Sequence, residues 1–269
     1  MADLQAVIFG IVQGLTEFLP ISSSGHLVLA ASWFGFAAEG ESLHLAVDIA
    51  TNTGTFLAVL VALRRDVWMA ASGFARGLTS AVARREDGWR LAWLVVLGSI
   101  PTAILGLGLR GVFEQLNAAV PVSIALAVTG VILWTAPVRG ARSDAGQLDW
   151  RDALIAGVAQ GVAVIPGISR SGSTIAALLW RDVDAALAAR LSFLLYLVAS
   201  AGVALIGFAE LRDAELGWRA VAWMTVASFV TGWLALAWLF RILRSGRFRW
   251  FSPYLWFVSS ATLIRVLAT

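Results

Sequence analysis

Four ionisable side chains lie inside long apolar stretches of the sequence: Glu17, His26, Asp48 and Arg170. Each costs about 2.5 kcal/mol or more at the centre of a bilayer, so each needs a partner or a function. A guanidinium matches phosphate oxygens, and a carboxylate or an imidazole can accept a proton. The residue types therefore indicate a polar site, suited to phosphate chemistry, inside an apolar protein.

Two related short segments carry the histidine and the arginine. The first is Pro20–His26 (PISSSGH), and the second is Pro166–Thr174. An ungapped shift of 147 positions lays residues 10–33 onto 157–180 with nine identities. Serine and glycine just before a short helix leave backbone N–H groups aimed at one point, which favours an anion. Ordinary helix capping explains one serine in each segment, but neither His26 nor Arg170. The two segments therefore predict a phosphate site with two contributing parts.

Oxygen ligands for a cation are also present. Gln13 and Glu17 are four residues apart and so share one face of a helix, and Asp48 and Asn52 form a similar pair. Such oxygens suit a divalent cation, and Glu17 is also available as a base. The alternative is that these side chains hydrogen-bond to one another between packed helices, and for Asp48 and Asn52 the sequence leaves both interpretations open.

The composition is that of an integral membrane protein. The 269 residues are 59% hydrophobic and 14% charged and include 13 Trp, a residue that favours membrane interfaces. The arginines lie in short loops between apolar runs, which indicates membrane topology and excludes nucleic acid as the expected partner. The chain has no cysteine, so disulfides and thiolate chemistry are excluded. Because the N-terminus lacks a basic signal region, the first apolar stretch is expected in the mature protein.

The serine-rich segment interrupts the first apolar stretch, residues 4–35. This stretch is too long for one span of roughly 20 residues and too short for two spans joined by a polar loop. We therefore predict a re-entrant hairpin whose broken tip is buried in protein or lines a wet cavity. Residues 151–181 repeat the pattern. Hydropathy alone would also permit eight or more ordinary spans.

The predicted fold is an all-α membrane domain with an inverted-topology repeat, each half a re-entrant hairpin plus three transmembrane helices. Arginine-rich segments belong in the cytoplasm, which places 64–90 and 241–249 there and hairpin one on the outer side. The two tips are expected to meet at the midplane. A separation beyond roughly 10 Å between Ser23 and Arg170 would defeat a shared phosphate site. The predicted ranges are 1–137 for the first repeat (spans 44–63, 91–110 and 119–137) and 151–269 for the second (spans 186–208, 218–241 and 252–268).

Residues 13–26 and 166–174 resemble the two signature motifs of the undecaprenyl-diphosphate phosphatases, also called bacitracin-resistance proteins. The resemblance covers the whole chain in length, segment order and repeat. It implies a multi-pass enzyme of the bacterial inner membrane that removes the terminal phosphate of a C55 isoprenoid diphosphate and so recycles the carrier lipid for cell-wall synthesis. It also implies a divalent cation, Mg²⁺ or Ca²⁺, and a pocket open to the outer face.

The resemblance also implies roles for single residues. Ser23 corresponds to the nucleophile, with His26 as the alternative, and either Glu17 or His26 accepts its proton while Arg170 stabilises the transferring phosphoryl group. The family's acidic motif falls on Gln13 and Glu17; many members carry a glutamate at the first position, so Asp48 is a candidate third ligand. Substrate contacts are expected from the other tip residues: Ser22, Ser24, Gly25, Ser169, Ser171, Gly172 and Thr174.

Other classes remain open on the sequence. Inverted repeats with broken helices are transporter architecture, so a polyprenyl-phosphate flippase or an anion carrier is the main alternative. Ser24–His26 also matches a fragment of the phosphatidic-acid phosphatases, but the chain has no lysine for that family's first motif. A structural subunit would leave Glu17 and Arg170 unexplained. The oligomeric state is left open, a homodimer included.

Overall fold

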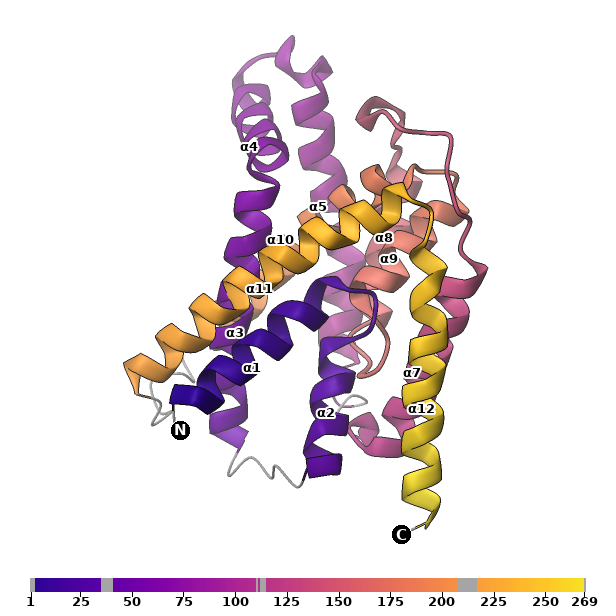
Figure 1. The fold of residues 1–269 in the computed structure, drawn as a ribbon. Coiled ribbons are helices and arrows are strands. Elements are labelled where there is room, and N and C mark those ends of the chain that lie inside the picture. Colours follow the sequence, from indigo (N-terminus) through magenta and orange to yellow (C-terminus); the bar gives the residue numbers. More distant parts are fainter. Residues whose placement is uncertain (1–2, 35–40, 110, 112–114, 208–216, 269) are drawn as a thin grey trace.

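The computed structural model of the chain describes residues 3–34, 41–109, 111, 115–207 and 217–268, and within these ranges the fold is all-helical with no β-strand (Figure 1). The helices of the first half are α1 (Asp3–Phe18), α2 (Ser23–Phe34), α3 (Glu41–Ala62), α4 (Arg64–Thr79), η1 (Ala83–Arg85), α5 (Asp87–Gly108) and α7 (Ala119–Thr135). Those of the second half are η2 (Ala145–Gln147), α8 (Trp150–Val162), α9 (Arg170–Trp180), α10 (Ala185–Gly207), α11 (Trp218–Arg244), η4 (Phe248–Trp250) and α12 (Phe251–Ala268).

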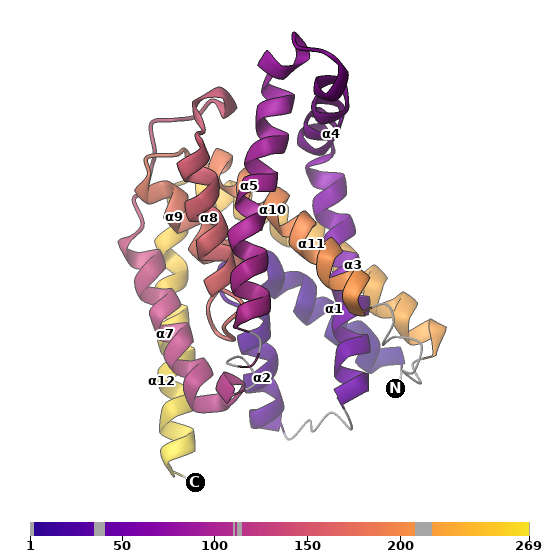
Figure 2. The same ribbon diagram turned by 180° about the vertical axis from the view of Figure 1, so that it is seen from behind.

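Both predicted hairpins are present as broken helix pairs, α1–α2 and α8–α9, with helix ends within a residue or two of the expected ones. In Figure 1, α2 runs downward from its tip while α9 runs upward from its own, and Figure 2 shows the same arrangement from behind. The two irregular tips therefore approach each other from opposite ends of the molecule.

The chain is a multi-pass membrane protein by the length and composition of its helices. Four described helices are long and apolar enough to cross a bilayer, in α5, α10, α11 and the segment Phe248–Ala268. A fifth span results if the bent pair α3–α4 counts as one, and α7 is a shorter apolar helix. The observed helices coincide with the predicted spans to within a few residues at most ends. The charge pattern also predicts outer-side loops at 36–43, 111–118 and 209–217; of these, residues 36–40, 112–114 and 209–216 lie outside the described residues.

The prediction was wrong for residues 64–90, which were expected to form a loop. Most of this segment is helical: α4 follows α3 after a bend of 80° and is joined through η1 to the start of α5. The arginines occupy one side of α4, and its small residues pack on the next helix, because Gly73 lies directly against Gly88 and Gly77 against the ring of Trp89. The prediction counted charges and overlooked this amphipathic pattern.

The halves pack reciprocally. α1 of the first hairpin lies along α11, the second long helix of the second half, and α8 of the second hairpin lies along α5, the second span of the first half. Close approach depends on small residues: a Cβ on Gly14 would lie 2.6 Å from the Ser228 carbonyl, and one on Gly157 would lie 2.0 Å from the Gly98 carbonyl. An inverted-topology repeat is expected to pack in this way; the repeat itself stays a prediction.

Candidate active site

The tips of the two hairpins touch. The backbone N–H of Gly167 donates to the Ser22 hydroxyl at 3.2 Å, and the Ser171 hydroxyl donates to the Leu19 carbonyl at 3.3 Å. A Cβ on Gly25 would lie only 3.0 Å from the Gly167 Cα. The polar segments that are 147 residues apart in sequence therefore form one continuous structure.

Both tips have unusual backbone conformations that their neighbours hold in place. Ser22 has a φ of 68° and Gly167 a φ of 97°, the left-handed region that non-glycine residues rarely adopt. Thr129 of α7 binds the second tip twice: its hydroxyl donates to the Gly167 carbonyl at 2.9 Å and accepts from the Ser169 N–H at 3.1 Å. Strained residues of this kind persist where the surrounding structure over-determines them, often at functional sites.

The Glu17 carboxylate lies at the junction of the two tips. One oxygen, Oε1, accepts from a terminal nitrogen of Arg170 at 2.5 Å. The other, Oε2, accepts from the Ser23 hydroxyl at 2.7 Å and from Gln13 Nε2 at 3.0 Å. Ser23 and Arg170 therefore bind the two oxygens of one carboxylate, well within the separation that a shared phosphate site requires.

Arg170 is the more accessible partner of this ion pair. Its side chain is 31% exposed, whereas that of Glu17 is 4% exposed. The guanidinium also stacks on the ring of Tyr196, with 4.8 Å from its central carbon to the ring centre, and the Tyr196 hydroxyl bonds to that of Thr55 at 2.9 Å. The buried acid and the aromatic ring together orient a guanidinium whose remaining N–H groups can reach a ligand.

His26 is bound on both ring nitrogens. Nδ1 lies 2.8 Å from the Ser22 carbonyl, and Nε2 lies 2.8 Å from the hydroxyl of Tyr254, whose ring is stacked on the imidazole. A carbonyl only accepts, so Nδ1 carries a proton; in the neutral imidazole, Nε2 accepts the proton of Tyr254. The hydroxyl of Ser23 bonds to Glu17 and not to His26.

A cavity of about 440 Å³ opens beside the ion pair, between α3, the start of α9 and α10. Arg170 reaches into it from one side, Asp48 and Asn52 line it from α3, and Ser200 lines it from α10. Asn52 Oδ1 lies 3.4 Å from Gln13 Nε2, so a chain of polar contacts connects the cavity wall to Glu17.

A comparison with known families and proteins identifies the chain. The family model described as bacitracin resistance protein BacA matches residues 6–261. A protein of Acaryochloris marina called undecaprenyl-diphosphatase is 60% identical over 266 residues, which is 99% of each chain, and one of Desulfosudis oleivorans with the same name is 42% identical over 98% of each chain. The chain belongs to the BacA family.

In this BacA family member, several residues predicted to bind substrate have other contacts. Ser22 and Ser169, which occupy the same place in the two segments, accept the backbone N–H groups of Gly25 and Gly172 as helix caps. Thr174 is fully buried and bonds to the Arg170 carbonyl at 2.8 Å and to the Ser192 hydroxyl.

Among the predicted substrate-binding residues, Ser24 is the exposed one, while Ser22, Gly25, Ser169, Ser171, Gly172 and Thr174 are buried. Capping therefore accounts for one serine in each tip, and the buried residues serve tip architecture.

Two residues at the site escaped the sequence reasoning, Tyr196 and Tyr254. They are the only tyrosines among the 269 residues, and each places its hydroxyl on a polar side chain near the tips. A chain with 13 Trp and 14 Phe uses tyrosine sparingly. This rarity was the available signal, because a buried tyrosine hydroxyl needs a polar partner.

Proposed function

We propose that this chain hydrolyses undecaprenyl diphosphate to undecaprenyl phosphate and inorganic phosphate, which regenerates the carrier lipid for cell-wall synthesis. The relatives that share most of its sequence carry the name undecaprenyl-diphosphatase. The observation that carries the proposal is the Glu17 carboxylate, which binds a serine hydroxyl with one oxygen and an arginine with the other. This arrangement combines a nucleophile, its base and a phosphate-binding cation.

The chemistry follows from these contacts. Ser23 Oγ attacks the terminal phosphorus, its proton passes to Glu17, and the bond to the bridging oxygen breaks, so that the polyprenyl monophosphate leaves. A water molecule then attacks the phosphoserine and releases inorganic phosphate and free Ser23. A serine hydroxyl is a weak nucleophile without an adjacent base, and the 2.7 Å contact supports Glu17 in that role over His26. His26 then serves to hold the first tip through Ser22 and Tyr254.

Arg170 binds the diphosphate and stabilises charge on the transferring group. The diphosphate oxygens compete with Glu17 Oε1 for the guanidinium, which faces the cavity. Loss of this ion pair upon substrate binding frees the carboxylate to accept the serine proton. Charge-assisted contacts to a phosphoryl group are the main source of catalysis in such reactions.

A divalent cation, Mg²⁺ or Ca²⁺, is part of the proposal. Among the described residues no group of three or more His, Asp or Glu forms a protein cage for a metal. The oxygens present fit the other mode, in which Mg²⁺ is held by one or two carboxylates together with substrate phosphates. Glu17 and Asp48 would supply the carboxylates and Gln13 an amide oxygen; when bound, the ion would neutralise phosphate charge.

The proposal also covers where the enzyme lies in the cell. The bacterial inner membrane is the proposed location, with the active site facing the outer side. Support comes from the arginines: in Figure 1, α4 and the turn between α11 and α12 lie at the same end of the molecule, which the charge rule assigns to the cytoplasm. The proposed partner is the lipid substrate within the bilayer.

The proposal is tested with purified full-length protein in detergent, a polyprenyl diphosphate and added Mg²⁺ or Ca²⁺, with released phosphate as the readout. Glu17→Gln keeps the side-chain size but removes the base, and we expect kcat to fall by about 10²–10⁴. Ser23→Ala and Arg170→Ala should lose activity at least as strongly. The matched control is Asp3→Asn, which alters an exposed acid at the start of the same helix.

Two results would contradict this assignment. Hydrolysis that survived Glu17→Gln and Arg170→Ala would place the active site elsewhere. Absence of hydrolysis with either cation, combined with movement of a polyprenyl phosphate across vesicle membranes, would favour a flippase.

The cation has its own test. A chelator should abolish phosphate release, and Asp48→Asn should raise the half-saturating cation concentration severalfold. An unchanged half-saturating concentration would remove Asp48 from the ligand set.

A further inference from the structure

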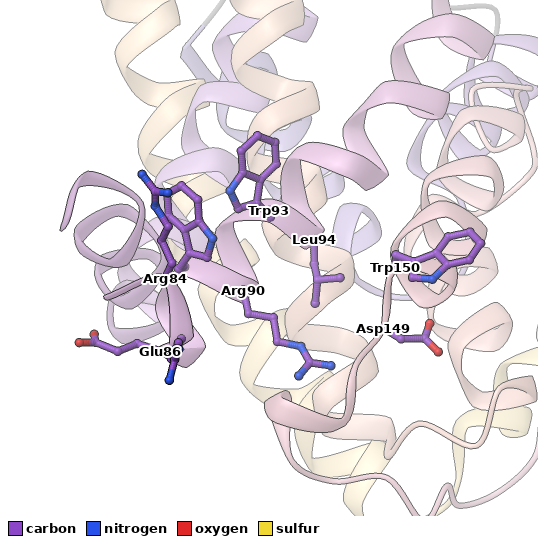
Figure 3. Close-up of a pocket in the computed structure, with 9 residues that line it drawn as sticks. Arg84, Glu86, Arg90, Trp93, Leu94, Asp149 and Trp150 are labelled. Carbon is purple, nitrogen blue, oxygen red and sulfur yellow. The ribbon is translucent and has the colours of Figure 1, made fainter. Parts of the chain in front are cut away.

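A second cavity, of about 570 Å³, lies where η1 and the first turns of α5 face the start of α8 (Figure 3). Three arginines line it, Arg84, Arg85 and Arg90, together with three tryptophans, Trp89, Trp93 and Trp150. It shares no lining residue with the cavity at Arg170. In Figure 3, Arg90 lies between the group around Arg84 and Glu86 and the group around Asp149 and Trp150.

The cavity carries an excess of positive charge. Its two acids are neutralised from outside, because Glu86 pairs with Arg76 at 2.9 Å and Asp149 pairs with Arg181 at 3.3 Å while capping α8. Among the described residues, no carboxylate pairs with its three arginines. Arg84 donates to the Gly77 carbonyl at 2.7 Å and Arg90 to the carbonyl of Leu148, both neutral acceptors.

The Arg85 side chain is exposed, and within the described part of the chain its guanidinium has no hydrogen-bond or ion-pair partner; only its backbone N–H is bonded, to the Val82 carbonyl at 3.0 Å. Its guanidinium is therefore available to an anionic ligand, and no internal contact has to break before it binds one.

The cavity also continues into an apolar surface. Trp93 begins a row of exposed side chains along one face of α5 that includes Val96, Ile100, Ile104 and Leu107, at spacings of three or four residues. α5 is one of the helices long and apolar enough to cross a bilayer, and the cavity lies at its first turns. Tryptophan favours the membrane–water interface, which places the arginines at headgroup depth and the apolar row among acyl chains.

We propose that this cavity binds the phosphate headgroup of an anionic phospholipid from the leaflet on the arginine-rich side. Arg85 and Arg90 contact the phosphate, the tryptophan rings pack against the glycerol and carbonyl region, and one acyl chain follows the apolar row of α5. Arginine clusters next to spanning helices attract anionic lipids. A soluble phosphate would use the arginines but not the apolar row, so the geometry favours a lipid.

The test is a lipid titration of the full-length protein in neutral detergent, followed by native mass spectrometry. We expect phosphatidylglycerol to bind more tightly than phosphatidylcholine of the same chain length. Arg85→Gln should weaken phosphatidylglycerol binding roughly threefold to tenfold without lowering thermal stability, since it breaks no contact. The matched control is Arg65→Gln, an exposed arginine of α4 outside the cavity, which should leave binding unchanged.

Three outcomes would overturn the proposal. Equal affinity for the two lipids would show that the cavity does not recognise the anionic headgroup. Equal losses with Arg85→Gln and Arg65→Gln would show that net charge alone attracts the lipid. Glycerol phosphate that binds as tightly as phosphatidylglycerol would identify a site for a soluble phosphate. Hydrolysis of polyprenyl diphosphate by either variant is a separate readout, so failure here leaves the proposed function intact.

Discussion

At the residue scale, the site depends on one buried carboxylate whose hydrogen-bond capacity is largely used. Glu17 accepts from Gln13, Ser23 and Arg170, and its side chain is 4% exposed. A buried carboxylate without such partners would be strongly destabilising, so the contacts explain how the acid stays inside the apolar protein. The same contacts bring base, nucleophile and cation together, so the residues that stabilise Glu17 are also the proposed reactive groups.

Tyr196 offers a prediction at this scale because its ring and its hydroxyl have different partners. Tyr196→Leu removes the ring under Arg170 and should raise KM roughly twofold to thirtyfold, the equivalent of about 0.5–2 kcal/mol for a cation–π contact. Tyr196→Phe keeps the ring, loses the hydroxyl with its bond to Thr55, and should change KM much less. Steady-state phosphate release measures both. Equal effects of the two variants would show that the hydroxyl, not the ring, is what matters.

At the element scale, hydrogen bonds join the two hairpin tips to each other and to α7. Ser22 of the first tip accepts an N–H from the second, Ser171 of the second donates to a carbonyl of the first, and Thr129 of α7 holds the second tip from behind. Irregular backbone at membrane depth is tolerated because its polar groups find partners within the protein. The tips are therefore expected to be intolerant of any added bulk.

Gly167→Ala tests this expectation. Its φ of 97° disfavours any side chain, and a Cβ would lie 2.6 Å from the Val122 carbonyl. We expect a loss of at least 1–2 kcal/mol, seen as a melting temperature lower by about 2–4 °C for each kcal/mol, together with reduced activity. Gly202→Ala is the control, since nothing lies within 4 Å of its Cβ position and alanine favours the helix. If Gly167→Ala left both the melting temperature and the activity unchanged, the tips would be able to rearrange around the added methyl group.

At the scale of the whole molecule, the two halves depend on each other for packing, and the distribution of arginines predicts an orientation in the membrane. The hairpin helices α1 and α8 each pack on a long helix of the opposite half, so neither half completes its packing alone. The two arginine-rich segments lie at one end (Figure 1). Because the positive-inside rule assigns that end to the cytoplasm, the opposite end should face outward.

The absence of cysteine makes this orientation testable. Ser245→Cys lies in the turn between α11 and α12, and Gly217→Cys lies at the other end of α11. A membrane-impermeant maleimide added to intact spheroplasts should label Gly217→Cys and should reach Ser245→Cys only after lysis. The reverse pattern would invert the proposed topology. Retained phosphatase activity in both variants serves as the control for correct folding.

The membrane class, the two broken hairpins and most helix boundaries followed from the sequence alone, because hydropathy, segment length and an ungapped repeat are local properties of the chain. Glu17 and Arg170 were singled out for the same reason, since a charged residue inside an apolar run is conspicuous without any structure. Ser23 was distinguished from the neighbouring serines only by the resemblance to the phosphatase family. The helix α4 was missed because its charges outweighed a short amphipathic pattern on one face.

Three features depended on how distant elements pack. The choice of Glu17 over His26 as the partner of Ser23 follows from the hydrogen bonds of His26 to Ser22 and Tyr254, a residue 228 positions away. The place of Ser22 at the junction follows from the contact between tips, in which its hydroxyl accepts the backbone N–H of Gly167. The place of Tyr196 under Arg170 follows from the position of α10 beside α9. Each depends on a contact between groups far apart in sequence, and composition and spacing carry no information about such distances.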